Sequence, residues 1–182
     1  MLVQAGIVGV FNSQMAIIAI PVAGGVIGAL YQSWRVVVNY KSEVMRKMKE
    51  YTLEYSLTKD TAHIDARTHL AHIFEPATRS ARRLSLEQIN EKIDNDSSVQ
   101  SKIRLLFNHW ENMSLAIHHK IAHEETAFEM VSARLVNTVY QYGAYIENVQ
   151  STNPRSYRHL VRLAKSWNKR VGKHKPLFKS HI

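Results

Sequence analysis

The chain has 182 residues, a formal net charge of +9 and no cysteine. The lack of cysteine excludes a disulfide scaffold, a cysteine nucleophile and a cysteine-ligated zinc site, and it agrees with a reducing compartment. The length accommodates an N-terminal segment followed by one domain with its own core.

The first predicted element is a membrane anchor. No charged side chain precedes Arg35, and residues 15–31 are almost entirely apolar. A spanning helix needs about 20 mostly apolar residues at a rise of about 1.5 Å each, and residues 14–34 supply that length. Tyr31 and Trp34 fall where an aromatic belt meets the membrane surface. We therefore expect residues 1–34 to form a single transmembrane helix that remains on the mature protein.

Two other interpretations of this segment stay open. A cleaved signal peptide is disfavoured because no lysine or arginine precedes the apolar run. A buried soluble helix is possible because polar residues interrupt the first apolar stretch at positions 12–14. If the segment spans a bilayer, its small residues share one face on which a second copy can pack closely, so we expect a homo-oligomer. These residues are Ala23, Gly24 and Gly28.

Basic residues follow the apolar run directly, whereas the N-terminal side offers none. The positive-inside rule then predicts a single-pass protein of the cytoplasmic (inner) membrane, with its N-terminus outside and its C-terminal domain in the cytoplasm. The basic residues are Arg35, Lys41, Arg46, Lys47 and Lys49.

The remainder of the chain is predicted to be all-α. Only two glycines, Gly143 and Gly172, and three prolines follow residue 28. We expect a cytoplasmic bundle of about four to five helices in residues 35–171 and a basic tail in residues 172–182.

The first predicted helices of the bundle are short. An apolar stripe at Val44, Met48, Tyr51 and Tyr55 continues from the anchor. A helix is expected over residues 61–74, ended by the following proline. Ser85 and Gln88 have the spacing of a capping box for a small helix that ends near residue 94.

The later helices carry the clearest periodicity. Asp96 or Ser98 is expected to cap a helix whose apolar positions step by three and four, and Asn153 followed by Pro154 predicts the start of the last helix. A second stripe, over residues 128–149, predicts one long and deeply buried helix. The first stripe comprises Val99, Ile103, Leu106, Trp110, Met113 and Ile117.

The net charge is concentrated at the C-terminal end. None of the 15 acidic residues follows Glu147, whereas nine of the 24 lysines and arginines do. In the predicted last helix the basic residues form one stripe, opposite an apolar stripe of Tyr157, Leu160, Ala164 and Trp167. A basic face attracts a lipid bilayer, nucleic acid or an acidic protein partner, and it can also be merely a solvated surface. The basic stripe is Arg155, Arg158, Arg162, Lys165 and Lys169.

Sites for chemistry are weakly indicated. His119 with His123, and His69 with His72, have helical spacings, but no metalloprotease pattern or cysteine accompanies them, so no metal and no cofactor are predicted. Asn108 and Glu111 can form a polar site inside the bundle, or Glu111 can pair with an arginine. For that pairing the candidates are Arg79, Arg82, Arg83 and Arg134. No phosphate loop or nucleophile motif occurs, so no enzyme activity is predicted.

Three stretches resemble domain-of-unknown-function family 4760, a group of small membrane-anchored bacterial and phage-associated helical proteins. They are residues 47–70, 105–130 and 156–167. Asn108 and Glu111 match the family's Asn-aromatic-aromatic-Glu motif, with His109 in place of the first aromatic. Ala122 and His123 depart from the usual Asp-Glu turn. The resemblance implies a helical architecture and membrane attachment, and its phage association suggests defence or superinfection control, but it implies no reaction.

These observations predict a membrane-anchored interaction protein. The first alternative is a nucleic-acid-binding protein that uses the basic C-terminal helix, and the second is a metal-dependent enzyme.

Overall fold

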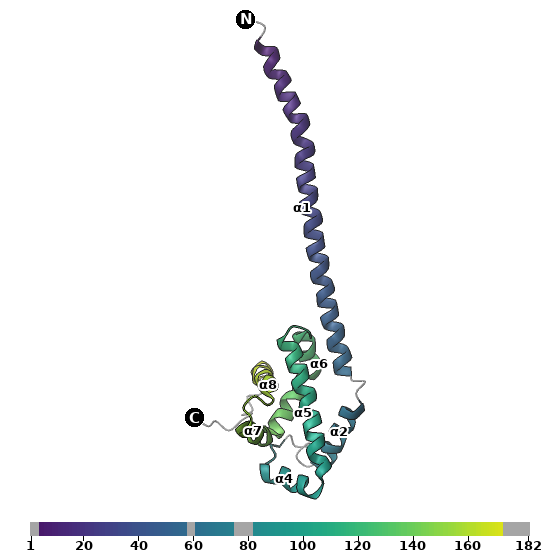
Figure 1. The fold of residues 1–182 in the computed structure, drawn as a ribbon, viewed down its shortest axis with the longest axis vertical. Coiled ribbons are helices and arrows are strands. Elements are labelled where there is room, and N and C mark those ends of the chain that lie inside the picture. Colours follow the sequence, from purple (N-terminus) through teal and green to yellow (C-terminus); the bar gives the residue numbers. More distant parts are fainter. Residues whose placement is uncertain (1–3, 58–60, 75–81, 173–182) are drawn as a thin grey trace. The chain divides into compact units, whose positions relative to one another are not determined.

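The computed structural model describes residues 4–57, 61–74 and 82–172, and it describes side chains from residue 28 onward, except for residues 56 and 57 (Figure 1). The described residues contain seven helices and no strand, so the all-α prediction is confirmed. The helices are α1 (Gln4–Leu57), α2 (Thr61–Ile73), α4 (Leu86–Asn95), α5 (Ser97–His118), α6 (Glu124–Gln141), α7 (Gly143–Thr152) and α8 (Arg158–Arg170).

The chain divides into two compact units, Met1–Arg46 and Lys47–Ile182. Most of the predicted span over residues 14–34 lies outside the residues whose side chains are described. Within the part that is described, no helix is long and apolar enough to cross a membrane.

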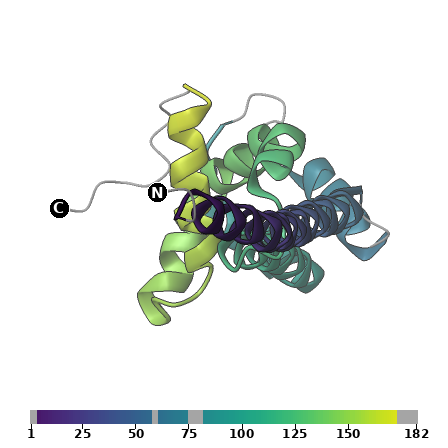
Figure 2. The ribbon, with the colours of Figure 1, turned by 90° about the horizontal axis from the view of Figure 1, so that it is seen from above.

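Helix α5 is the central element of the second unit. It packs against α2, α4 and α8, while α6 packs against α8 and α7. Figures 1 and 2 both show α2 and α8 on opposite sides of α5. This central position follows from the predicted apolar stripe of α5, because all six side chains of the stripe are buried.

Local capping signals formed as predicted. Helix α4 begins with the complete capping box, because the backbone N–H of Gln88 donates to Ser85 Oγ at 3.2 Å and that of Ser85 to Gln88 Oε1 at 3.0 Å. Asp96 caps α5 by accepting from the Ser98 N–H at 2.8 Å. Each of these contacts spans three residues or fewer, so the sequence pattern contains all the information that they need.

The prediction of one helix over residues 128–149 was wrong, because α6 ends at Gln141 and α7 begins at Gly143. The Gln141 carbonyl accepts from the backbone N–H of Leu84 at 2.9 Å, in the segment that precedes α4. The buried Tyr142 ring lies edge-on to Phe74 and Phe107, with both centroids at 5.7 Å. This interhelical packing outweighs the continuous apolar pattern, and the described part of the second unit has six helices after α1 rather than four to five.

The predicted start of the last helix was also wrong. Asn153 ends α7 instead, and residues 154–157 form a turn in which Asn153 Oδ1 accepts from the Arg155 N–H at 3.2 Å. Tyr157 adopts a left-handed conformation with φ of 54°, and α8 begins only at Arg158. An Asn-Pro pair suits a turn as well as a helix start, and here it forms the turn.

The last turns of α1 are attached to the rest of the second unit by polar contacts that the apolar stripe did not predict. Tyr51 is exposed, whereas Thr52 is buried. The Thr52 hydroxyl donates to the Met48 carbonyl and accepts from the His123 N–H at the start of α6, both at 2.7 Å. The Tyr55 hydroxyl donates to the His109 carbonyl in α5 at 2.7 Å.

Candidate functional site

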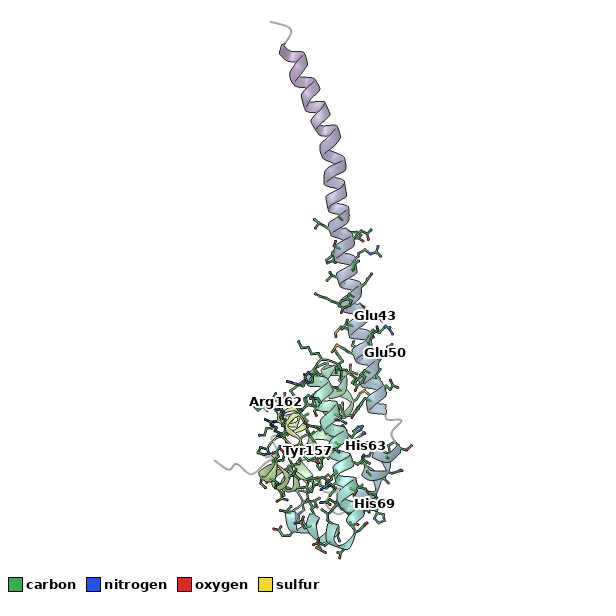
Figure 3. All side chains as sticks on the ribbon, in the orientation of Figure 1. Glu43, Glu50, His63, His69, Tyr157 and Arg162 are labelled. Carbon is green, nitrogen blue, oxygen red and sulfur yellow. The ribbon has the colours of Figure 1, made fainter. Side chains whose placement is uncertain are left out.

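The candidate site is the exposed face of α8. Arg158, Arg162, Lys165 and Lys169 lie on this face at spacings of four, three and four residues, and all four are exposed. We call these four residues the basic face. Figure 3 shows Arg162 among nitrogen-bearing side chains on the outer side of α8.

The opposite face of α8 enters the core. Leu160, Ala164 and Trp167 are each 0% exposed, and Tyr157 is half-buried. The predicted division of α8 into an apolar and a basic side is therefore confirmed in its geometry. Arg155 is exposed as well, but it lies in the turn before α8 and does not belong to the helical face.

Glu111 of α5 caps the first turn of α8. Its Oε1 accepts from the backbone N–H of His159 at 3.2 Å, and its Oε2 accepts from that of Leu160 at 2.8 Å. Free N–H groups and the positive end of the helix dipole favour a carboxylate at this position. Glu111 therefore caps the N-terminus of α8, although it belongs to a different helix.

The described hydrogen bonds of Glu111 go to the backbone of α8 and not to the predicted arginines. Arg83 pairs with Glu147 at 3.0 Å, and Arg79 lies outside the described residues. Asn108 is exposed on α5 and does not accompany Glu111 into the contact with α8. The partner of the family-motif glutamate is thus the backbone of α8.

A second acidic contact holds the C-terminal end of α8 against the start of α6. The indole N–H of Trp167 donates to Glu124 Oε1 at 3.2 Å, and Arg170 pairs with Glu125 at 2.5 Å. The Arg170 guanidinium also lies over the Phe128 ring, 3.8 Å from its centroid. Because glutamates fix both ends of α8, the basic face has a defined orientation on the second unit.

A groove borders the basic face between α8 and the α5–α6 turn, with a volume of about 560 Å³. Its lining includes His118, Lys120, His159 and Arg162. The rings of His118 and His159 lie 4.9 Å apart. Desolvation, together with the nearby Arg158 charge, lowers the pKa of His159 despite the opposing effect of Glu111. Glu124 and Glu125 also line the groove, so its surface carries both signs of charge and does not extend the basic face.

The other predicted site residues are not assembled into a chemical centre. Ala23 and Gly24 lie outside the described side chains, and Gly28 is exposed with nothing within 4 Å of the position that a Cβ would occupy. His119 lies in the α5–α6 turn, and His123 caps α6 by accepting from the Thr126 N–H. The described residues contain no group of three or more metal-ligating side chains.

The comparisons with known proteins agree with the predicted resemblance. A family model described as Domain of unknown function (DUF4760) matches residues 19–167. No curated protein and no solved structure matches the chain. The match covers most of the chain, including α2 and every helix from α4 to Trp167 of α8, and the chain belongs to this family.

Proposed function

We propose that the chain is a membrane-anchored interaction protein whose basic face binds an anionic membrane surface. The observation that carries the proposal is the basic face itself, four exposed cations on a helix whose other side is fixed in the core. A cation near an anionic leaflet contributes about 1 kcal/mol, so four together contribute about 4 kcal/mol at low salt.

The choice of lipid over nucleic acid rests on the N-terminal sequence. Residues 1–34 carry no charged side chain, and a basic segment follows them, as in a single-pass anchor with its C-terminal domain in the cytoplasm. A tethered domain meets the anionic leaflet at high effective concentration, so even a modest affinity suffices. Self-association through Ala23, Gly24 and Gly28 would multiply the number of basic faces at one place.

The test uses the full chain in nanodiscs. Because the chain has no cysteine, Ser166→Cys on the exposed part of α8 accepts a single fluorophore without removing a charge. We expect a quencher on the lipid headgroups to quench this label in anionic nanodiscs, much less in neutral ones, and progressively less as salt rises.

Charge reversal identifies the surface responsible. Arg158→Glu with Lys165→Glu should abolish the quenching that depends on anionic lipid. Arg82→Glu with Lys92→Glu changes the charge equally at positions in and before α4, outside α8, and should leave the quenching intact. Equal quenching in neutral and anionic nanodiscs would contradict the proposal. Binding of duplex DNA without lipid-dependent quenching would favour the nucleic-acid alternative instead.

A further inference from the structure

A second groove lies away from the basic face, between α2 and α6, with a volume of about 520 Å³. This volume is within the range of small-molecule sites, which is about 300–1,000 Å³. Arg67 and Thr68 of α2 and Arg134 of α6 are among the residues that line it. No aspartate or glutamate is among the described residues that line it.

Arg134 is partly desolvated and lies near the like charge of Arg67. Loss of surrounding water, and then the positive charge of Arg67, lower the pKa of Arg134. Within the described part of the chain, neither guanidinium has a carboxylate or carbonyl partner. Surface arginines usually diverge or pair with acids, because like charges repel. Among the described residues of the groove, these two positive charges face no acidic side chain, so an anion bound between them would be favoured electrostatically.

The floor of the same groove is apolar. Leu70, Leu106 and Tyr142 lie there, all of them buried in the core. An anion held by the arginines would therefore have an apolar surface beside it, on which the remainder of an organic molecule can rest. The combination of a charged rim and an apolar floor is typical of sites for small organic anions.

We propose that this groove binds a phosphomonoester, with Arg67 and Arg134 holding the phosphate and the apolar floor contacting the rest of the ligand. Two guanidinium charges match a phosphomonoester, which carries about −1.5 to −2 at neutral pH, better than they match a single carboxylate. The planar guanidinium also donates two parallel hydrogen bonds to phosphate oxygens. The proposal is independent of the anchor and of the basic face, since it shares no residue with either.

The experiment measures binding to the full chain in detergent by calorimetry and by the rise in melting temperature. Three probes separate the possible sources of the phosphate, namely inorganic phosphate, adenosine monophosphate and a short-chain phosphatidic acid below its micelle concentration. Binding of adenosine monophosphate in preference to the lipid assigns a soluble ligand, and the reverse assigns a lipid headgroup. Either result supports the site, provided that it depends on the two arginines.

The variants give two independent readouts. Arg67→Gln and Arg134→Gln should each weaken phosphate-probe binding by about tenfold or more, as expected for a lost charged hydrogen bond. In phosphate-free buffer, Arg134→Gln should melt at the same temperature as the wild type or higher, because it removes a repulsion. The exposed Arg104→Gln on α5 is the matched control and should leave binding unchanged.

Three results would contradict the proposal. One is that none of the three probes binds. Another is that binding is unaffected by both arginine substitutions. A third is a lower melting temperature for Arg134→Gln in phosphate-free buffer, which would show that Arg134 has a structural partner. If the label on α8 shows no quenching that depends on anionic lipid while a phosphate probe still binds, the proposed function is contradicted and the phosphate site is not.

Discussion

Substitution of Glu111 tests whether α8 is held by a cap from another helix. Glu111→Ala removes both hydrogen bonds to the first turn of α8, at 3.2 and 2.8 Å. A lost N-cap costs about 0.5–2 kcal/mol, and a carboxylate near the helix N-terminus contributes about 0.3–1 kcal/mol through the helix dipole. We therefore expect the free energy of unfolding to fall by about 2 kcal/mol, which lowers the melting temperature by about 4–8 °C in a domain of this size.

The assay is thermal melting of the full chain in detergent, followed by far-UV circular dichroism. Glu111→Gln retains one acceptor oxygen and loses the charge, so it should show about half of the effect. Glu129→Ala removes a carboxylate exposed on α6 and is the matched control. Hydrogen exchange should quicken at the start of α8 and stay unchanged in α2. If Glu111→Ala melts like Glu129→Ala, the carboxylate does not hold α8 and the argument from the two bonds is wrong.

Four further outcomes are expected. Trp167→Ala should destabilise the second unit by about 3 kcal/mol or more, because removal of a fully buried indole leaves a cavity. If this variant melts at the wild-type temperature, α8 does not pack on the core. Lys120→Gly should stabilise the protein by about 1 kcal/mol, since Lys120 has a φ of 57° in the turn that follows α5, where glycine is unstrained. Folding disfavours protonation of His159, so stability should decline as pH falls below its ordinary pKa of 6.5, and His159→Gln should make melting less dependent on pH there. Gly28→Leu should weaken cross-linked self-association in detergent without affecting folding, because the space beside Gly28 is open.

Much of the fold could be predicted because its signals are local. The stripe of α5 repeats every three or four residues, so the sequence alone identifies which side of the helix is buried. The caps at Ser85 and Asp96 involve partners within three residues along the chain. The opposite faces of α8 follow from the same periodicity, since Trp167 and Lys165 fall on different sides of one helix.

The errors share a different physical cause, because each involves a contact between residues distant in sequence. The start of α8 depends on Glu111, which precedes His159 by 48 positions. The break between α6 and α7 leaves the Gln141 carbonyl to accept from Leu84. The groove that contains Arg67 and Arg134 was missed for the same reason, since no short pattern connects α2 with α6.

In the second unit, the apolar core and the polar contacts between helices contribute differently to the structure. The buried side chains provide the free energy of folding, but an apolar surface tolerates rotation and sliding of one helix on another. Thr52, Tyr55 and Glu111 each bind the backbone of a helix remote in sequence, and a hydrogen bond has a required distance and direction. These contacts therefore specify where the start of α6, the middle of α5 and the start of α8 lie. For α8, the same carboxylate that fixes the first turn also fixes the direction of the basic face.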